Sequence, residues 1–231
     1  MPNYVINNVV FETDDEEKLN KIFEAIKGDE EIDGEIPCID FNKIIPMPES
    51  LNIEAGSRTD NAIEIYLTKN KSDNNKIVLE CLERANRFHI WRDNLTDEEI
   101  AQITNRSDFT LSDALKIGEI AINNIINYGA KDWYDWCREN WGTKWNACYC
   151  QKNRNTITFQ TAWSCPQPVL KELSKKFNAD LTVEFADEDI GGGNCGSFTV
   201  ENGEILDMIW GDEDDAARFW GYDDAQDYYG E

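Results

Sequence analysis

The chain has 231 residues, 41% of them hydrophobic, which is enough for a sizeable buried core in one large domain or in a domain with an insertion. Its formal net charge of −24 disfavours direct nucleic-acid binding, because such a field repels phosphate backbones. No run of 18 apolar residues is present and the first residues lack a basic and an apolar signal region, so we expect a cytoplasmic protein that does not interact with membranes.

The first expected element is a strand over Val5–Phe11, which is rich in β-branched residues. The next residues have the pattern of a capping box, with Thr13 at the N-cap and Glu16 at N3 of a helix that Gly28 ends. The sequence therefore predicts a β–α unit over residues 1–40.

Residues 41–140 predict a mainly helical insertion. Helices are expected over 62–67 and 77–88, after a capping box that begins at Thr96, and from about residue 112 to a C-cap at Gly129. The apolar spacing of the last helix predicts that it buries Leu115, Ile122, Ile125 and Ile126.

Residues 141–231 change to a period of two, which is typical of strands. Two hairpins are expected, over 144–163 and 196–209, with a helix after Pro166 and a strand over 181–185 between them. A short acidic segment with aromatic residues closes the chain. The predicted fold class is α+β: a ferredoxin-like split β-α-β sheet with a mainly helical insertion and an added C-terminal hairpin.

Several segments resemble a known family. The run from Trp133 to Ala147 resembles the signature of the YubB-type ferredoxin-like family of plasmid and phage proteins. The segments 41–48 and 159–164, the pair Pro166 and Pro168, residues 186–188 and the turn Asn202-Gly203 are similar to further parts of that family. The resemblance implies a ferredoxin-like fold and a setting on mobile elements. It implies no reaction, because the family is largely of unknown function.

The excess charge lies at the two ends of the chain. Residues 1–40 hold 12 acids and 3 bases, residues 180–231 hold 16 acids and one base, and the middle is neutral. In a split β-α-β sheet the first and fourth core strands are neighbours, so we expect both ends to form one acidic face. The residues expected to bind a partner there are Asp187, Glu188, Asp189, Asp212, Glu213, Asp214, Asp215, Asp223 and Asp224.

Such a face favours a basic protein partner over nucleic acid. The leading hypothesis is a mobile-element accessory protein that mimics nucleic acid and inhibits a host defence protein, or another host protein with a basic nucleic-acid-binding surface. Acidic residues also serve solubility alone, so that interpretation stays open. The sequence leaves the oligomeric state open as well.

A second hypothesis is a small-ligand binder. Tryptophan beside basic and amide side chains can stack on and neutralise a nucleotide-like ligand. The residues for this site are Trp136, Arg138, Trp141, Lys144 and Asn146. The alternative for the same residues is a packed aromatic corner of the core.

The remaining motifs predict no catalytic site, no metal and no cofactor. Seven cysteines in an intracellular chain indicate reduced thiols, and Cys148-x-Cys150 is a poor zinc knuckle. The cluster spacing of iron–sulfur proteins is absent. His89 is the only histidine and has no nucleophile motif beside it, while the glycines at 191–193 precede a strand, unlike a phosphate loop.

Overall fold

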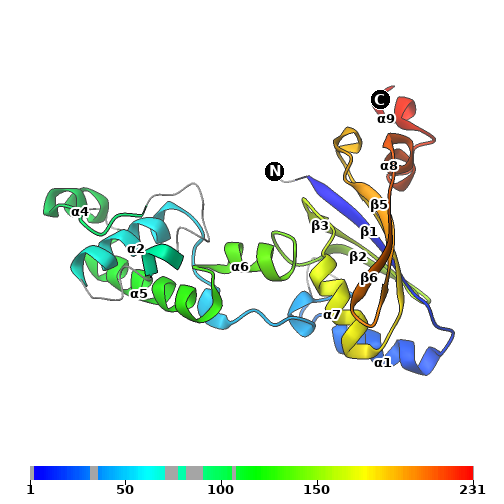
Figure 1. Ribbon diagram of the computed structural model, residues 1–231, viewed down its shortest axis with the longest axis horizontal. Coiled ribbons are helices and arrows are strands. Elements are labelled where there is room, and N and C mark those ends of the chain that lie inside the picture. The colour runs from blue at the N-terminus through cyan, green and yellow to red at the C-terminus, as the bar shows by residue number, and fades with distance from the viewer. Residues whose placement is uncertain (1–2, 32–35, 71–77, 82–90, 106–107, 231) are drawn as a thin grey trace. The chain divides into compact units, whose positions relative to one another are not determined.

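The computed structural model describes residues 3–31, 36–70, 78–81, 91–105 and 108–230 (Figure 1). The chain divides into two compact units, one made of Met1–Pro46 with Cys137–Glu231 and the other of Met47–Trp136. The insertion expected from the sequence spans 41–140. His89 and most of the helix expected over 77–88 lie outside the described residues.

The first unit is built on a six-stranded sheet with the order β2-β3-β1-β4-β5-β6. Every neighbouring pair of strands is antiparallel. The predicted ferredoxin-like arrangement with an added hairpin is confirmed, since β1 lies between β3 and β4 and the last hairpin extends the sheet to β6. The strands are β1 (Tyr4–Phe11), β2 (Cys148–Asn153), β3 (Thr156–Ala162), β4 (Leu181–Asp187), β5 (Cys195–Glu201) and β6 (Glu204–Trp210).

One face of this sheet is covered by α1 (Glu16–Ile26) and α7 (Gln167–Phe177) (Figure 1). Alternate residues of β1 point to this face and are buried, and Phe11 meets Phe23 of α1 edge to face with ring centroids 5.2 Å apart. The predicted N-cap of α1 is wrong. Thr13 accepts the Asp15 amide, and Asp15 is the cap, because its carboxylate accepts the Lys18 amide at 3.0 Å and suits the positive end of the helix.

The opposite face is covered at one end by α8 (Glu213–Phe219) and the 3-10 turn η3 (Ile190–Gly192). Ala186 of β4 and Cys195 of β5 point to this face, and they form a buried cluster with Ile190, Ala216 and Ala217. A last helix, α9 (Ala225–Gly230), packs on α8. The sequence predicts neither helix. Both are short, and α8 is stabilised by this packing and by a capping box at Asp212.

The two acidic stretches do not form one face, which corrects the expectation from the sequence. β1 and β4 are indeed neighbours, but they are antiparallel. The acids that follow β1 therefore lie beside the start of β4, where the Glu12 amide donates to Asp180, whereas the acids that follow β4 lie beside the start of β1. An eight-residue strand separates the groups by about 24 Å. Figure 1 shows α1 and α8 at opposite ends of the sheet.

The second unit is helical, as expected. It contains η2 (Glu49–Leu51), α2 (Ser57–Lys69), α4 (Asp97–Thr104), α5 (Leu111–Tyr128) and the first half of α6 (Trp133–Asn140). A short 3-10 turn in the first unit, η1 (Phe41–Lys43), precedes them. Thr96 caps α4 and Gly129 ends α5 in the left-handed conformation, both as predicted. Within the described ranges, no helix is both long and apolar enough to cross a bilayer.

Helices α2 and α5 make the main contact of this unit, and they approach closely at Gly118. A Cβ atom at that position would collide with the Ala62 carbonyl oxygen and would lie 2.6 Å from Tyr66 Cβ. Ile122 and Ile125 are buried as predicted and Leu115 is partly buried, but the prediction for Ile126 is wrong, since it is 59% exposed. Ile126 lies just outside the stripe of α5 that faces α2.

Candidate functional site

A hollow of about 350 Å³ opens between α8 and the outer strands β5 and β6. Two glycines allow a close approach of neighbouring backbone and side-chain atoms there. A Cβ atom at Gly196 would collide with the Ile209 carbonyl oxygen, and one at Gly211 would lie 2.9 Å from Cys195 Sγ. We call this cavity the C-terminal hollow. The residues that line it include Glu184, Cys195, Ser197, Ile209, Trp210, Asp215, Arg218 and Phe219.

The polar groups of the C-terminal hollow are paired within the protein. Glu184 accepts a hydrogen bond from Asn8 Nδ2 at 3.1 Å, and Arg218 forms an ion pair with Asp215 at 2.8 Å. Burial and the carboxylates of Asp215 and Asp212 raise the pKa of Cys195 to about 11, so this thiol is protonated at neutral pH. The Cys195 thiol is therefore not activated as a nucleophile.

Strand β6 exposes large apolar side chains on both of its faces. Ile209 and Trp210 are each 64% exposed, and Leu206 is also exposed. Ile209 pairs with Ser197 and points into the hollow, whereas Trp210 contacts Phe185 edge to face, with ring centroids 6.1 Å apart, which places the indole on the face of the sheet that α1 and α7 cover. β6 is an edge strand of the sheet. Exposed large apolar groups on an edge strand are typical of an interaction surface.

The structure brings the predicted acidic partner-binding residues of the C-terminal half together around α8 and α9. The Trp220 indole donates to the Asp187 carbonyl oxygen at 3.0 Å, and the Tyr228 hydroxyl donates to that of Glu188 at 2.7 Å. These bonds hold the helices against the end of β4. We call this group the acidic end, and it comprises Asp187, Glu188, Asp189, Asp212, Glu213, Asp214, Asp215, Asp223, Asp224 and Asp227.

Several of these carboxylates hold the local backbone. Asp187 is buried and accepts the Asp189 amide and Asn194 Nδ2, both at 2.9 Å. Asp212 and Asp215 cap the start of α8, while Asp214 accepts the Ala225 amide and Asp224 accepts the Asp227 amide. These hydrogen bonds position the acidic end.

Asp189 and Glu213 converge near the hydroxyl of Tyr229. Partial desolvation and the charges of Glu213 and Asp189 raise the pKa of Tyr229. The shift reports a concentrated negative potential, since like charges disfavour a phenolate. Glu213 and Asp223 are exposed. They are therefore suited to contact a partner.

The predicted ligand-binding set is not assembled as a stacking surface. Trp141 is buried, packs against Phe41 with ring centroids 5.7 Å apart and donates to the Ile45 carbonyl oxygen at 2.9 Å. Asn146 accepts the Phe41 amide at 2.9 Å and donates to Asp40 at 2.7 Å. Trp136 is buried as well, and Arg138 shares its short helix α6. Trp141 and Asn146 therefore serve the packing of the first unit, and Trp136 is a buried residue of the second.

Lys144 has a different setting, which sequence reasoning missed. Its ammonium lies 4.7 Å from the ring centroid of Trp145 and 5.0 Å from that of Trp163, in cation–π contacts with both indoles. Trp163 has a positive φ of 71°, and its amide and carbonyl are held by Asn3 and Asn194. In the sequence, the only indication of this setting for Lys144 is the position of Trp163 at the end of a predicted strand.

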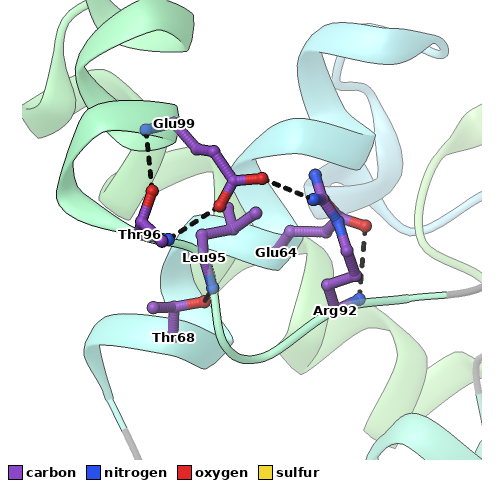
Figure 2. Close-up of polar contacts among 6 residues, drawn as sticks. All are labelled: Glu64, Thr68, Arg92, Leu95, Thr96 and Glu99. Carbon is purple, nitrogen blue, oxygen red and sulfur yellow. Dashed lines mark hydrogen bonds and ion pairs between the residues drawn. The ribbon is translucent and has the colours of Figure 1, made fainter.

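A polar network in the second unit joins α2 to α4 (Figure 2). Glu64 is buried and accepts the backbone amide of Arg92 at 3.2 Å and its guanidinium at 3.0 Å. The same guanidinium pairs with Glu99 at 2.9 Å, and the other oxygen of Glu99 accepts the Thr96 amide. Figure 2 shows these side chains pointing toward one another. The arrangement satisfies a buried charge, which is a structural role.

A second charged cluster in this unit surrounds Lys131. Its ammonium pairs with Asp132 at 2.5 Å and lies within 3.6 Å of carboxylate oxygens of Asp60 and Asp135. Burial lowers the pKa of Lys131, but the three carboxylates, Asp132 first, outweigh burial and raise it. Lys131 occupies the position that a cation would take among these acids. Over the described part of the chain, no group of three or more His, Cys, Asp or Glu residues could hold a metal ion.

Comparison with known proteins places the acidic end in a recognised domain. Residues 144–230 match a family described as the ferredoxin-like domain in Api92-like protein. A relative in Escherichia coli (strain K12), the uncharacterized protein YubB, is 29% identical over an alignment of 98 residues. The match covers 39% of this chain and 66% of the relative, just under two thirds. The crystal structure of a protein api92 from Yersinia pseudotuberculosis aligns with a TM-score of 0.39 and 11% identity, covering 91% of this chain and 98% of that one. The family resemblance predicted from the sequence is confirmed.

Proposed function

Residues 144–230 form a ferredoxin-like domain of the kind found in Api92-like protein, and from this premise we propose that the chain is a protein-binding module. Its binding surface is the acidic end together with the C-terminal hollow, and its partner is a basic protein. The observation that carries this proposal is the position of exposed Ile209 in the wall of the hollow, next to the acidic end.

This combination has the anatomy of a protein interface. Protein interfaces commonly have an apolar centre surrounded by a polar rim. Ile209 supplies an exposed apolar centre at the wall of the hollow, and the carboxylates of α8 and α9 supply the rim. An extended segment of the partner could also pair with the outer edge of β6.

The charge of the surface selects the class of partner. The acidic end holds ten acids, and the one base of residues 180–231, Arg218, is already paired with Asp215. Such a surface attracts lysine and arginine and repels phosphate. We infer that the partner is a nucleic-acid-binding protein, such as a host defence protein in a phage or plasmid setting, whose basic surface the acidic end occupies in place of DNA or RNA. Only the acidic end takes part in this proposal, because the acids that directly follow β1 lie at the other end of the sheet.

The test uses the full chain to capture partners from a bacterial lysate, after which each partner is identified by mass spectrometry, purified and titrated by calorimetry. Glu213→Lys combined with Asp223→Lys reverses two exposed charges of the acidic end. We expect roughly tenfold weaker binding, because two interface charge pairs are lost and turned repulsive. Competition with a DNA duplex should displace the chain from the partner.

The matched control is Glu12→Lys combined with Asp14→Lys, which makes the same change in net charge on exposed residues at the opposite end of the sheet. This control should leave the affinity within twofold of the wild type at 150 mM salt, where distant charges are screened. Equal losses in the two variants, or a partner that DNA fails to displace, would contradict the proposal. Circular dichroism checks that all variants are folded.

A further inference from the structure

Two cysteines that are far apart in the sequence meet at the edge of the sheet away from the acidic end. Cys150 lies on the edge strand β2, and Cys38 lies in the segment that runs beside it. The Cys38 thiol contacts the carbonyl oxygen of Gln151 at 3.6 Å and lies within hydrogen-bonding reach of Cys150 Sγ. Both side chains are only partly buried.

The segment that carries Cys38 is held in this position from both sides. The Gly28 amide donates to the Pro37 carbonyl oxygen at 2.9 Å, and the Asp40 amide donates to that of Ile26 at 2.7 Å, which ties the segment to the end of α1. On the other side, Asn146 bonds to both Asp40 and Phe41. The proximity of the two thiols therefore follows from a network of backbone and side-chain bonds.

The surroundings of Cys150 favour its thiolate. The Cys38 thiol, which donates to the Gln151 carbonyl oxygen, and the backbone amides of Ile39 and Cys38 lie close enough to Cys150 Sγ to hydrogen-bond to its thiolate. These bonds outweigh burial and lower the pKa of Cys150, whereas the pKa of its partner Cys38 is raised, first by that same thiol–thiolate bond and then by burial. The charge of Lys152 acts on the same pair and favours the ionised form.

We propose that Cys150 and Cys38 form a reactive dithiol that exchanges with low-molecular-weight disulfides. The Cys150 thiolate attacks one sulfur of such a disulfide, forms a mixed disulfide and releases one thiolate. Cys38 then loses its proton to solvent and attacks Cys150 Sγ, which expels the second thiolate. The products are a Cys38–Cys150 disulfide and two small thiols, so the small disulfide takes up the two electrons that the protein loses.

The bond would close a loop around the entire second unit, Met47–Trp136, which is inserted between the two cysteines. A disulfide that closes a long loop restricts the unfolded chain, so oxidation should raise the thermal stability of the protein. The dithiol is thus a modification site within the first unit, independent of the acidic end.

The test is incubation of the reduced full chain with oxidised glutathione, followed by intact mass measurement and peptide mapping. The wild type should lose two hydrogens and yield a peptide pair linked through Cys38 and Cys150. Cys38→Ser should stop at a glutathione adduct on Cys150, and Cys150→Ser should form no linked pair and at least tenfold less adduct on Cys38. The matched control Cys148→Ser, on the same strand, should still form the Cys38–Cys150 bond.

Alkylation rates measured against pH give a second readout that needs no substitution. Burial raises the pKa of Cys148 to about 11, so Cys150 should react with iodoacetamide at least tenfold faster than Cys148 at pH 7. Equal rates at the two cysteines would overturn the proposal. So would a linked peptide that joins any other pair of cysteines, or persistence of the glutathione adduct in the wild type.

Discussion

The amide of Tyr4 donates to the carboxylate of Glu188 at 2.9 Å across 184 residues of sequence. This bond ties the start of β1 to the residue that follows β4, and so places the acidic end beside the beginning of the chain. Because the strands are antiparallel, the same pairing sends the acids after β1 to the opposite end. The antiparallel pairing of β1 with β4 therefore decides which acidic residues lie close enough together to bind one partner.

Ile209 is expected to be the apolar centre of the partner interface. Ile209→Ala truncates an exposed side chain at the wall of the C-terminal hollow, and we expect partner binding to weaken by about 2 kcal/mol, the order of the free energy gained when such an apolar side chain is buried. Calorimetric titration with the purified partner measures the loss. The matched control is Tyr149→Ala, which removes a 70% exposed aromatic ring from β2, at the other edge of the sheet, and should not change the affinity.

Asp187 is expected to stabilise the end of β4 more than any surface acid does. Asp187→Ala leaves the Asp189 amide and the Asn194 side chain without their acceptor in a nearly buried site, which should cost about 2 kcal/mol of unfolding free energy. Urea denaturation measures it. Asp223→Ala removes an exposed acid from the same region and should change stability by less than about 0.5 kcal/mol. A similar loss in both variants would show that Asp187 is not a support of the acidic end.

Gly118 is expected to be required at the contact of α2 and α5. Gly118→Ala improves helix propensity by about 1 kcal/mol, but the added methyl group meets the Ala62 carbonyl and Tyr66 Cβ. We expect a net destabilisation of about 2 kcal/mol because the helices must move apart. Glu119→Ala, at the exposed neighbouring position, is the control and should be nearly neutral. Thermal unfolding that shows a more stable Gly118→Ala protein would refute the close contact.

Lys131 is expected to limit the stability of the folded protein at alkaline pH. Its folded pKa lies above the ordinary value of 10.5, so its stabilising effect is fully present below pH 10.5 and is lost as pH rises through the folded value. Lys131→Met should lower stability at pH 7 by about 3 kcal/mol, since three partly or fully buried carboxylates lose their counterion.

The informative measurement is the difference in unfolding free energy between the wild type and Lys131→Met across pH. It should be constant from pH 7 to about 10 and shrink above 10.5. The same variant should also gain stability as pH falls, because burial already raises the pKa of Asp135 and removal of the lysine charge raises it further. A difference that does not vary with pH would mean that Lys131 acts only by packing.

Local patterns predicted most of the sheet domain. The strands β1, β3 and β4, helix α7 and the Asn202-Gly203 hairpin follow from period-two and helical spacing and from residues that favour one type of turn. The capping box at Thr96 and the left-handed Gly129 are equally local. These features depend on neighbours a few residues away, so a single sequence contains the information for them.

The candidate site depended on contacts between distant residues. The sequence determined that acids gather at both ends of the chain, that the middle is neutral and that the domain is ferredoxin-like. Only the tertiary structure decided that the antiparallel pairing of β1 and β4 separates the two acidic groups, that Trp141 and Asn146 serve the core, and that Cys38 meets Cys150. The physical reason is that composition fixes how much charge and apolar surface a chain carries. Strand direction and packing decide which side chains lie next to one another in the folded protein.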